Sequence, residues 1–191
     1  MSAPFWEPLA ASPQQPPIVT VGTTLPASPT DTQEAILVDS LTNPTYQWRF
    51  RYNANSTSPY KWEFIGGPPL LGWSATSVTN GATLGAWVNM VGTAVILPRS
   101  GEYQIDGGCT VSHPSGGATS YASIWAGNAS NVLAYSNFGF PSAGGFSGSI
   151  YVPPQKWNLT AGNAVGMGGQ SNFANGAWSF LGWRMLPVRC S

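Results

Sequence analysis

The chain has 191 residues, of which 42% are hydrophobic and 7% are charged, and its seven basic and seven acidic side chains cancel. This length allows one or two small domains with a buried core, whose surface must be built from uncharged polar residues and glycine. No basic stripe could neutralise phosphates and no apolar run reaches the length of a membrane span, which argues against nucleic-acid binding and membrane insertion.

With 23 Gly and 17 Pro, and few of the Lys and Glu residues that favour helices, the composition indicates an all-β protein with many turns. The amino-terminal residues lack a basic region followed by an apolar run, so we expect no secretory signal peptide.

Residues 1–29 are rich in proline, which fixes φ and removes backbone donors, so we expect an extended arm there rather than a packed unit. Such a composition is typical of a disordered tail, but Phe5, Trp6 and Leu9 are side chains that disordered tails tend to lack. We therefore predict that this arm docks on another chain and that these three residues are its anchors.

Residues 30–67 are predicted to form a meander. Aromatic and polar side chains alternate through Tyr46–Tyr52 and again through Tyr60–Ile65, as they do in strands with one apolar face. Turn-forming residues fill the segment 53–59 between them, which indicates an antiparallel hairpin. The short segment Glu34–Asp39 supplies the preceding strand.

One face of the predicted hairpin is aromatic and consists of Trp48, Phe50, Tyr52, Tyr60, Trp62 and Phe64. The predicted cross-strand pairs are Tyr52–Tyr60, Phe50–Trp62 and Trp48–Phe64, with Arg49 and Glu63 meeting on the opposite face. A lone hairpin is only marginally stable in water. The aromatic face must therefore be covered by the rest of the chain, a symmetry mate or another protein.

The segment Gly66-Gly67-Pro68-Pro69 marks a boundary, because glycine frees the backbone and proline stops a strand ladder. Beyond it, residues 68–191 show short strands separated by turn signals, which predict a sandwich or barrel. The predicted strands are Ala86–Met90, Thr93–Leu97, Glu102–Ser112, Ser120–Ala126, Asn131–Phe138, Phe146–Val152, Asn163–Gln170 and Ala177–Leu186.

Three segments of this region resemble strands of jelly rolls of the complement-globular-head and tumour-necrosis-factor type. ILPRSGEYQIDG (Ile96–Gly107) is similar to the Pro-x-x-Gly-x-Tyr strand opening of that family. WNLTAGNAVGM (Trp157–Met167) resembles its Leu-x-x-Gly-Asp-x-Val strand, with Asn163 where Asp is usual. AWSFLGWRMLP (Ala177–Pro187) resembles its final strand, although Ser179 is followed directly by phenylalanine. The resemblance implies a jelly-roll sandwich and a homotrimer.

The hairpin, with LPASPTDTQEAILVD before it and GGPPL after it, resembles a module of tail and other structural proteins of tailed bacteriophages, especially those of actinobacteria. Phage fibre and decoration proteins also commonly end in jelly rolls of this type. The resemblance implies a virion component that is made in the host cytoplasm and carried in the extracellular particle. Its implied partners are copies of itself and other virion proteins.

Candidate catalytic groups are few. His113 precedes a proline in a Ser- and Gly-rich loop. The segment GFSGS, residues 145–149, is not the Gly-x-Ser-x-Gly of a nucleophile elbow, so we expect a solvent-facing histidine. Glu102 and Asp106 share one parity of a strand; such carboxylates can hydrolyse glycosides, but we favour surface polar residues. The sequence contains no cluster of His, Cys and carboxylate residues of the kind that would indicate a metal site. We expect no catalytic residues, no metal and no cofactor.

Cys109 and Cys190 permit one disulfide, and in the jelly roll implied by the resemblance the first and last strands can lie side by side. We nevertheless predict free thiols, because nothing in the sequence indicates an oxidising folding compartment.

Four aromatic residues fall in or near predicted loops: Phe138, Phe140, Phe173 and Trp178. Exposed rings with Asn and Ser nearby could hold sugars. We favour the alternative that they fill the inter-sheet core or a trimer axis, because a sandwich poor in Leu and Ile must build its core from aromatics.

The sequence therefore predicts a minor tail or fibre-type subunit that docks by its arm and presents an oligomeric sandwich outward, with host-surface glycans as a further ligand to consider. A capsid decoration protein that stabilises the head is the alternative within this class. A free carbohydrate-binding module is the alternative from another class, and a hydrolase has almost no residue support.

Overall fold

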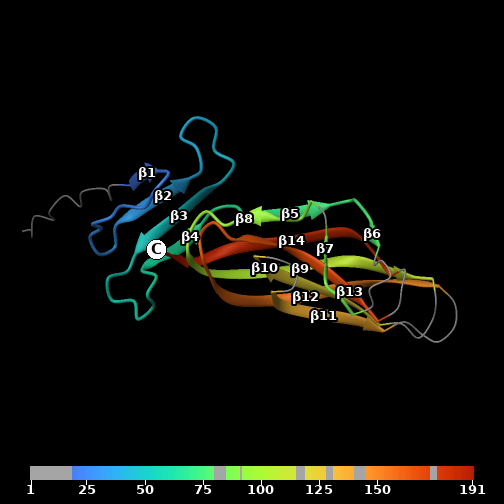
Figure 1. Cartoon of the computed structure of the whole chain (residues 1–191). Coiled ribbons are helices and arrows are strands. Elements are labelled where there is room, and N and C mark those ends of the chain that lie inside the picture. Colours follow the sequence, from blue (N-terminus) through green and yellow to red (C-terminus); the bar gives the residue numbers. More distant parts are fainter. Residues whose placement is uncertain are drawn as a thin grey trace, which may run out of the picture.

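The computed structural model describes residues 19–79, 85–90, 92–114, 119–127, 131–139, 145–172 and 176–191, and these ranges contain strands and no helix (Figure 1). The strands are β1 (Val19–Gly22), β2 (Glu34–Val38), β3 (Gln47–Tyr52), β4 (Trp62–Gly66), β5 (Leu70–Ser74), β6 (Val78–Thr79), β7 (Val88–Asn89), β8 (Val95–Ile96), β9 (Gly101–His113), β10 (Thr119–Ala126), β11 (Val132–Gly139), β12 (Phe146–Leu159), β13 (Ala164–Ser171) and β14 (Ala177–Cys190). Within these ranges there is accordingly no helix long and apolar enough to cross a membrane.

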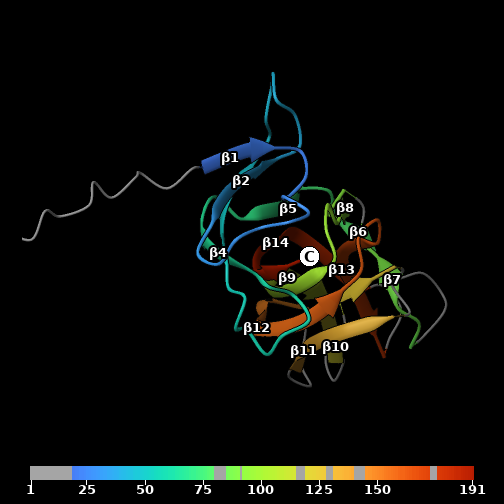
Figure 2. The same cartoon turned by 90° about the vertical axis from the view of Figure 1, so that its left-hand side faces the viewer.

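The strands form two sheets packed against each other (Figures 1 and 2). The first sheet has the order β1-β2-β3-β4-β14-β9-β12, with β5 and β6 also paired to β14. The second sheet has the order β11-β10-β13-β7, with β8 also paired to β13. From β9 onward the chain crosses repeatedly from one sheet to the other, which is the connectivity of a jelly roll. The expected all-β fold with a jelly-roll sandwich is confirmed.

Each strand predicted between residues 86 and 186 has a counterpart among β7 to β14. The sequence missed β1, β5 and β6. It also ended β12 and β14 too early, at Val152 and Leu186, whereas these strands continue to Leu159 and Cys190.

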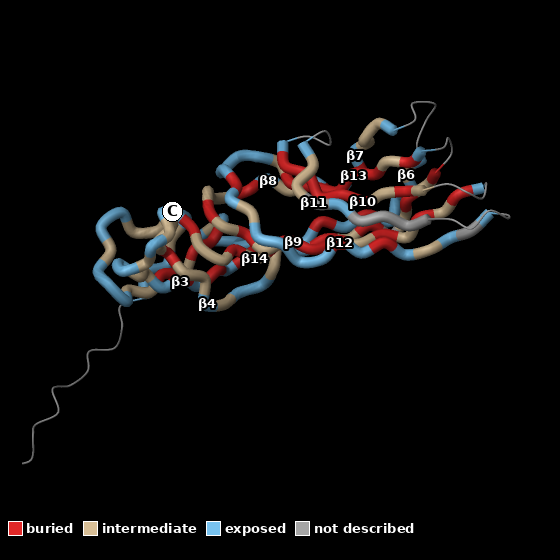
Figure 3. The backbone as a smooth tube through the Cα atoms, turned by 90° about the horizontal axis from the view of Figure 1, so that it is seen from below, coloured by how far each residue is buried: buried red, intermediate tan, exposed pale blue. Residues whose placement is uncertain are grey.

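A common hydrophobic core lies between the two sheets and continues beneath the meander (Figure 3). Ile105 and Met185 contribute from the first sheet, and Ile124 and Met167 from the second. Trp48 of the meander belongs to the same buried cluster. The meander and the sandwich are therefore packed as one body, although glycine and proline separate them in sequence.

Strand β14 joins the two parts. Along one edge it pairs in turn with β6, β5 and β4, and along the other edge it pairs with β9. The contact with β4 places Arg189 opposite Glu63 and Cys190 opposite Trp62. The sheet of the meander is thus a continuation of one sheet of the jelly roll.

The end of the proline-rich arm lies on the chain's own sheet. Val19–Gly22 pairs in parallel with β2, and Leu25 packs against the core. The Arg99 guanidinium also donates to the Thr23 carbonyl at 2.8 Å. The prediction that all of residues 1–29 docks on another chain is therefore wrong for the part from Val19 onward. The proposed anchors Phe5, Trp6 and Leu9 lie outside the described residues.

The predicted hairpin is present as β3 and β4, but its register differs by two residues from the prediction. Phe50 lies opposite Phe64, with ring centroids 5.9 Å apart. Tyr52 lies opposite Trp62, with ring centroids 5.3 Å apart. The predicted pairs Tyr52–Tyr60, Phe50–Trp62 and Trp48–Phe64 are therefore wrong.

A longer loop explains the changed register. The Asn53 amide donates to the Lys61 carbonyl at 2.9 Å, so the loop runs past Pro59 and includes Tyr60. The Asn53 side chain donates to Glu63 at 2.9 Å and holds the base of the loop. Local hydrogen bonding by this asparagine, rather than the number of turn-forming residues, sets the loop length.

Arg49 does not meet Glu63. Its Nε donates to Glu34 of β2 at 2.9 Å, whereas Arg51 is the residue opposite Glu63. The register of β3 against β4 shifts between Arg49 and Phe50. The two-residue change in register therefore removes the predicted ion pair, and Arg49 pairs with β2 instead.

The chain itself covers the central rings of the hairpin. Trp48, Phe50 and Trp62 are buried, and the Trp48 indole N–H donates to the Pro68 carbonyl at 2.8 Å. The centroid of the Trp48 ring lies 6.4 Å from that of Tyr103 in the sandwich. The sequence left three possible covers open: the rest of the chain, a symmetry mate or another protein. For these three side chains the structure shows the first.

Candidate functional site

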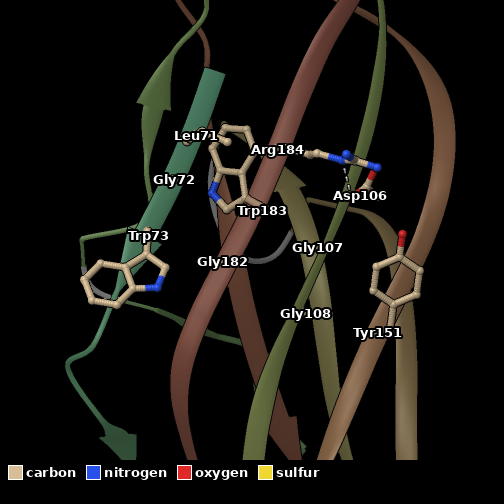
Figure 4. A pocket seen from close by; sticks show the side chains of 10 residues that line it. All are labelled: Leu71, Gly72, Trp73, Asp106, Gly107, Gly108, Tyr151, Gly182, Trp183 and Arg184. Carbon is tan, nitrogen blue, oxygen red and sulfur yellow. Dashed lines mark hydrogen bonds and ion pairs between the residues drawn. The ribbon is translucent and has the colours of Figure 1, made fainter. Parts of the chain in front are cut away.

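A shallow apolar trough lies across the outer face of the first sheet and has a volume of about 390 Å³ (Figure 4). Strands β5, β14, β9 and β12 supply its lining residues, which are Leu71, Gly72, Trp73, Asp106, Gly107, Gly108, Tyr151, Gly182, Trp183 and Arg184. Ile105 and Met185 belong to the core, so the alternate residues beside them face away from the second sheet.

The strand register builds the trough from one row of residues. Trp73 lies opposite Gly182, which lies opposite Gly108, which in turn lies opposite Tyr151. Neighbouring strands are about 4.8 Å apart, so the Cα atoms of Trp73 and Tyr151 are separated by about 14 Å. In Figure 4 the two rings stand on either side of the strands that carry these two glycines. The two aromatic side chains form the walls and the two glycines form the floor.

Both rings lie close to the floor glycines. A Cβ atom on Gly182 would be 3.3 Å from Cδ1 of Trp73. A Cβ atom on Gly108 would be 3.6 Å from Cδ2 of Tyr151 and 2.8 Å from the Ile150 carbonyl oxygen. Side chains at these two positions would fill the space between the walls. The hollow therefore depends on glycine in two neighbouring strands.

Three apolar side chains of the trough are open to solvent, whereas Trp183 is buried beneath it. Leu71 is 66% exposed, Trp73 65% and Tyr151 54%. Single exposed apolar residues are common on protein surfaces, but contiguous apolar patches mark interaction sites. The trough therefore has the character of a binding surface.

An ion pair lies two residues along the strands from the glycine row. Arg184 Nε donates to both carboxylate oxygens of Asp106, at 3.0 and 2.9 Å. Asp106 is largely covered, with 10% of its side chain exposed, whereas 56% of the Arg184 side chain is exposed. The hydrogen bond to Asp106 raises the pKa of the Arg184 guanidinium, which stays charged. At this end of the trough the exposed charged group is therefore the positive guanidinium of Arg184.

The predicted carboxylate pair has no catalytic arrangement. Glu102 accepts a hydrogen bond from Arg189 at 3.2 Å, and Asp106 is held by Arg184. Each carboxylate of β9 is thus paired with an arginine of β14. Asp106 is 7% exposed, so the expectation of a surface residue is wrong at this position. Among the described residues, no group of three or more His, Cys, Asp or Glu side chains could hold a metal ion.

Two residues singled out from the sequence are buried. His113 ends strand β9 and is 3% exposed, so the expectation of a solvent-facing histidine is wrong. Trp178 is fully buried, and its indole N–H donates to the Tyr121 carbonyl at 3.0 Å. It is therefore a core residue, as the favoured alternative proposed, and not a ligand-binding loop residue. Phe138 lies in β11, and Phe140 and Phe173 lie outside the described ranges.

Cys109 and Cys190 are both buried, and they form no disulfide with each other in this structure. Burial raises the pKa of Cys109 to about 12 and that of Cys190 to about 11. Cys190 Sγ lies 3.7 Å from the Tyr103 hydroxyl oxygen. Both thiols are protonated at neutral pH, so neither is an activated nucleophile.

A second group of rings lies on the second sheet. Trp87, Tyr121 and Tyr135 form a ring cluster in which the centroid of Trp87 is 6.3 Å from each tyrosine and the two tyrosines are 6.1 Å apart. Ala122 faces the core, so Tyr121 beside it faces outward. Tyr135 is 60% exposed. This cluster is an open aromatic surface on the face opposite to the trough.

Sequence reasoning did not identify Leu71, Trp73 or Tyr151. Tyr151 lies in the predicted strand Phe146–Val152, where alternation with Ile150 could have placed it on the outer face. Trp73 lies in β5, a strand that the sequence analysis did not predict. Only the pairing of β5, β14, β9 and β12 shows that both rings border one trough.

Comparison with known proteins gives little further guidance. No family model and no curated protein matches the chain. Among solved structures, the chain is similar to a carbohydrate-binding module of Cellvibrio mixtus lichenase 5A in complex with cellotriose, at 21% identity and a TM-score of 0.29. The match covers 60% of this chain and 86% of that chain. A likeness of this degree carries no argument about function.

Proposed function

We propose that the protein is a non-catalytic structural subunit of a bacteriophage virion, of minor tail or fibre type, which associates with protein partners through the trough. The observation that carries this proposal is the exposed apolar surface of Leu71, Trp73 and Tyr151 on the first sheet. Monomeric proteins rarely leave such side chains together in solvent. A partner that covers them removes apolar surface from water, which stabilises the assembly.

The chemistry of the trough favours a protein partner over a sugar. Sugar hydroxyls need acceptors as well as donors beside the rings, and the carboxylate of the trough, Asp106, is largely covered and already bonded to Arg184. Protein interfaces, by contrast, are centred on aromatic side chains and arginine within an apolar patch. The trough has this composition.

The virion assignment is supported by the sequence around the meander, which resembles a module of tail and other structural proteins of tailed bacteriophages. On this proposal the protein is made in the host cytoplasm and functions in the extracellular particle. A capsid decoration protein that stabilises the head is the alternative position. Antibody labelling of particles in electron micrographs would separate tail from head.

The test removes both walls of the trough. We expect the Trp73→Ala, Tyr151→Ala double variant to fold with an unchanged melting temperature and to be lost from purified particles when it replaces the natural chain, as measured by mass spectrometry. Leu41→Ala is the matched control, because Leu41 is 68% exposed and lies outside the trough. Normal incorporation of the double variant would refute the proposal.

The ring cluster of Trp87, Tyr121 and Tyr135 favours a second candidate function, which is adhesion to host-surface glycans. Exposed rings can stack on the faces of sugars, and several copies in one assembly would add avidity. Tyr135→Ala should then abolish binding of the full chain to a glycan array. Deletion of residues 1–18 separates the two classes: a free carbohydrate-binding module would keep its glycan binding, whereas a particle protein that attaches through its arm would no longer be incorporated into particles. The deletion must end at Ile18, because β1 belongs to the sheet.

A further inference from the structure

We propose that the trough receives the segment Pro4–Leu9 of a second copy of the chain, so that each copy is linked to the next by its arm. This inference rests on the proposed function of the trough as an association surface, and it names the occupant of that surface. Four properties of the trough and of the arm sequence carry it: size, apolar character, charge and reach.

The size of the trough fits a short peptide. Its volume of about 390 Å³ is near the lower end of the range of roughly 300–1,000 Å³ found for pockets that hold small ligands. The floor between Trp73 and Tyr151 is formed by the backbone of two strands, so an extended chain can approach it without meeting side chains. A few residues in extended conformation would therefore occupy the trough.

The sequence of Pro4–Leu9, PFWEPL, has the matching apolar character. Its two prolines favour an extended polyproline-type conformation, and segments of this kind dock in grooves lined by aromatic side chains. Residues 1–18 contain too many prolines to build a core around Phe5 and Trp6. The segment and the trough thus each carry rings that need a partner.

The charges are also complementary. Glu7 is the only charged side chain in the sequence of residues 1–18, and it directly follows Trp6. Arg184 exposes 56% of its side chain beside the trough, whereas its partner Asp106 is largely covered. With Phe5 and Trp6 between the aromatic walls, Glu7 would meet the open side of this guanidinium.

The position of the arm favours a second copy. Strand β1 ends the first sheet, and β2, β3 and β4 separate it from β14. The chain therefore enters the sheet at the edge remote from the trough. The roughly ten residues between Leu9 and Val19 span about 30 Å when extended, which is enough to reach a neighbouring copy. An arm-to-trough contact joins two different surfaces, so repeated copies form a ring where the rotation between copies closes and a filament where it does not. A homotrimer would be one such ring.

The first experiment measures self-association of the purified full chain by sedimentation velocity. We expect Trp6→Ala and Trp73→Ala each to raise the dissociation constant at least about tenfold, as for an aromatic anchor of an interface. Gln14→Ala in the arm and Leu41→Ala on the surface are the matched controls and should have no effect. Melting temperatures of all four variants report whether the fold is intact.

The second experiment tests whether the contact is made between copies. The Trp6→Ala chain keeps an intact trough, and the Trp73→Ala chain keeps an intact arm. An equimolar mixture should therefore form dimers that grow no further, although each variant alone is monomeric. A mixture that stays monomeric would overturn the proposal, because it would place the arm on its own trough or on a different protein.

The results separate this inference from the proposed function. If Trp73→Ala abolishes association and Trp6→Ala leaves it unchanged, the trough is an association surface but Pro4–Leu9 is not its occupant. If neither variant changes the association, the trough is not the contact between copies and this inference is wrong, while incorporation into particles still tests the proposed function. If the full chain is monomeric at all concentrations, a second copy is not the partner and this inference is wrong. Incorporation into particles then still tests the proposed function.

Discussion

At the scale of single residues, Trp62 shows how one side chain connects the meander to the sandwich. It is 4% exposed, it packs edge-on against Tyr52, and it lies opposite Cys190 near the end of β14. The sequence placed Trp62 on an aromatic face but could not say what covers that face. The structure shows that the cover comes from the same chain.

Replacing Trp62 by alanine should lower the free energy of unfolding by about 3–5 kcal/mol, because it leaves a cavity in the shared core. Urea denaturation monitored by circular dichroism measures this change. Trp73→Ala is the matched control and should cost less than about 0.5 kcal/mol, since Trp73 is 65% exposed. A loss below about 1 kcal/mol for Trp62→Ala would contradict the observed burial.

The two buried thiols predict a loss of stability at alkaline pH. Their pKa values rise from the ordinary 9.0 to about 12 for Cys109 and about 11 for Cys190, because burial disfavours the thiolate. As the pH rises, the unfolded chain therefore loses these two thiol protons at a lower pH than the folded chain does. Stability is unaffected by them below pH 9 and falls between pH 9 and 11, by at most about 1.4 kcal/mol per pH unit for each thiol.

Urea denaturation at several pH values between 8 and 11 checks this prediction. In Cys109→Ala the decline should be shallower than in the natural chain, because one of the two groups no longer titrates. Equal slopes for the two proteins would show that Cys109 ionises as easily in the folded state as in the unfolded state.

At the scale of elements, the long strands β12 and β14 show where local reasoning fails. Both strands were predicted to end at the residue before a proline, at Val152 and Leu186. In β12 the register shifts between Val152 and Gln155, and in β14 it shifts between Pro187 and Arg189. In β12 the irregularity leaves Pro153 and Pro154 out of the regular pairing, whereas Pro187 of β14 lies opposite Tyr103 directly before the shift. Both strands continue beyond these irregularities.

The extra length of β14 has a structural consequence. Its residues beyond Pro187 pair with β4, and this pairing continues the sheet of the sandwich into the meander. The Gly-Gly-Pro-Pro segment therefore interrupts the strand pattern in the sequence, but it does not separate the meander from the sandwich in the packing. Strand β5, which begins directly after this segment, also supplies Leu71 and Trp73 to the trough.

At the scale of the whole molecule, the shared strand and core predict one cooperative unit. Heating should produce a single transition in calorimetry, with equal calorimetric and van't Hoff enthalpies, because the meander cannot unfold without exposing the core beneath Trp48 and Trp62. The measurement should be made at a protein concentration at which the chain is monomeric. Two resolved transitions would show that residues 30–67 fold independently of the sandwich.

The sequence alone determined the fold class, the positions of most strands and the aromatic face of the hairpin, because alternation and turn residues act over a few neighbouring positions. It also indicated free thiols and gave no support for a catalytic site. The hairpin register depended on the hydrogen bonds of Asn53 across the loop, and the cover over the hairpin rings depended on contacts with distant parts of the chain. Only the tertiary structure brought Trp73 and Tyr151 to opposite walls above Gly182 and Gly108, since four strands distant in the sequence must pair before that surface exists.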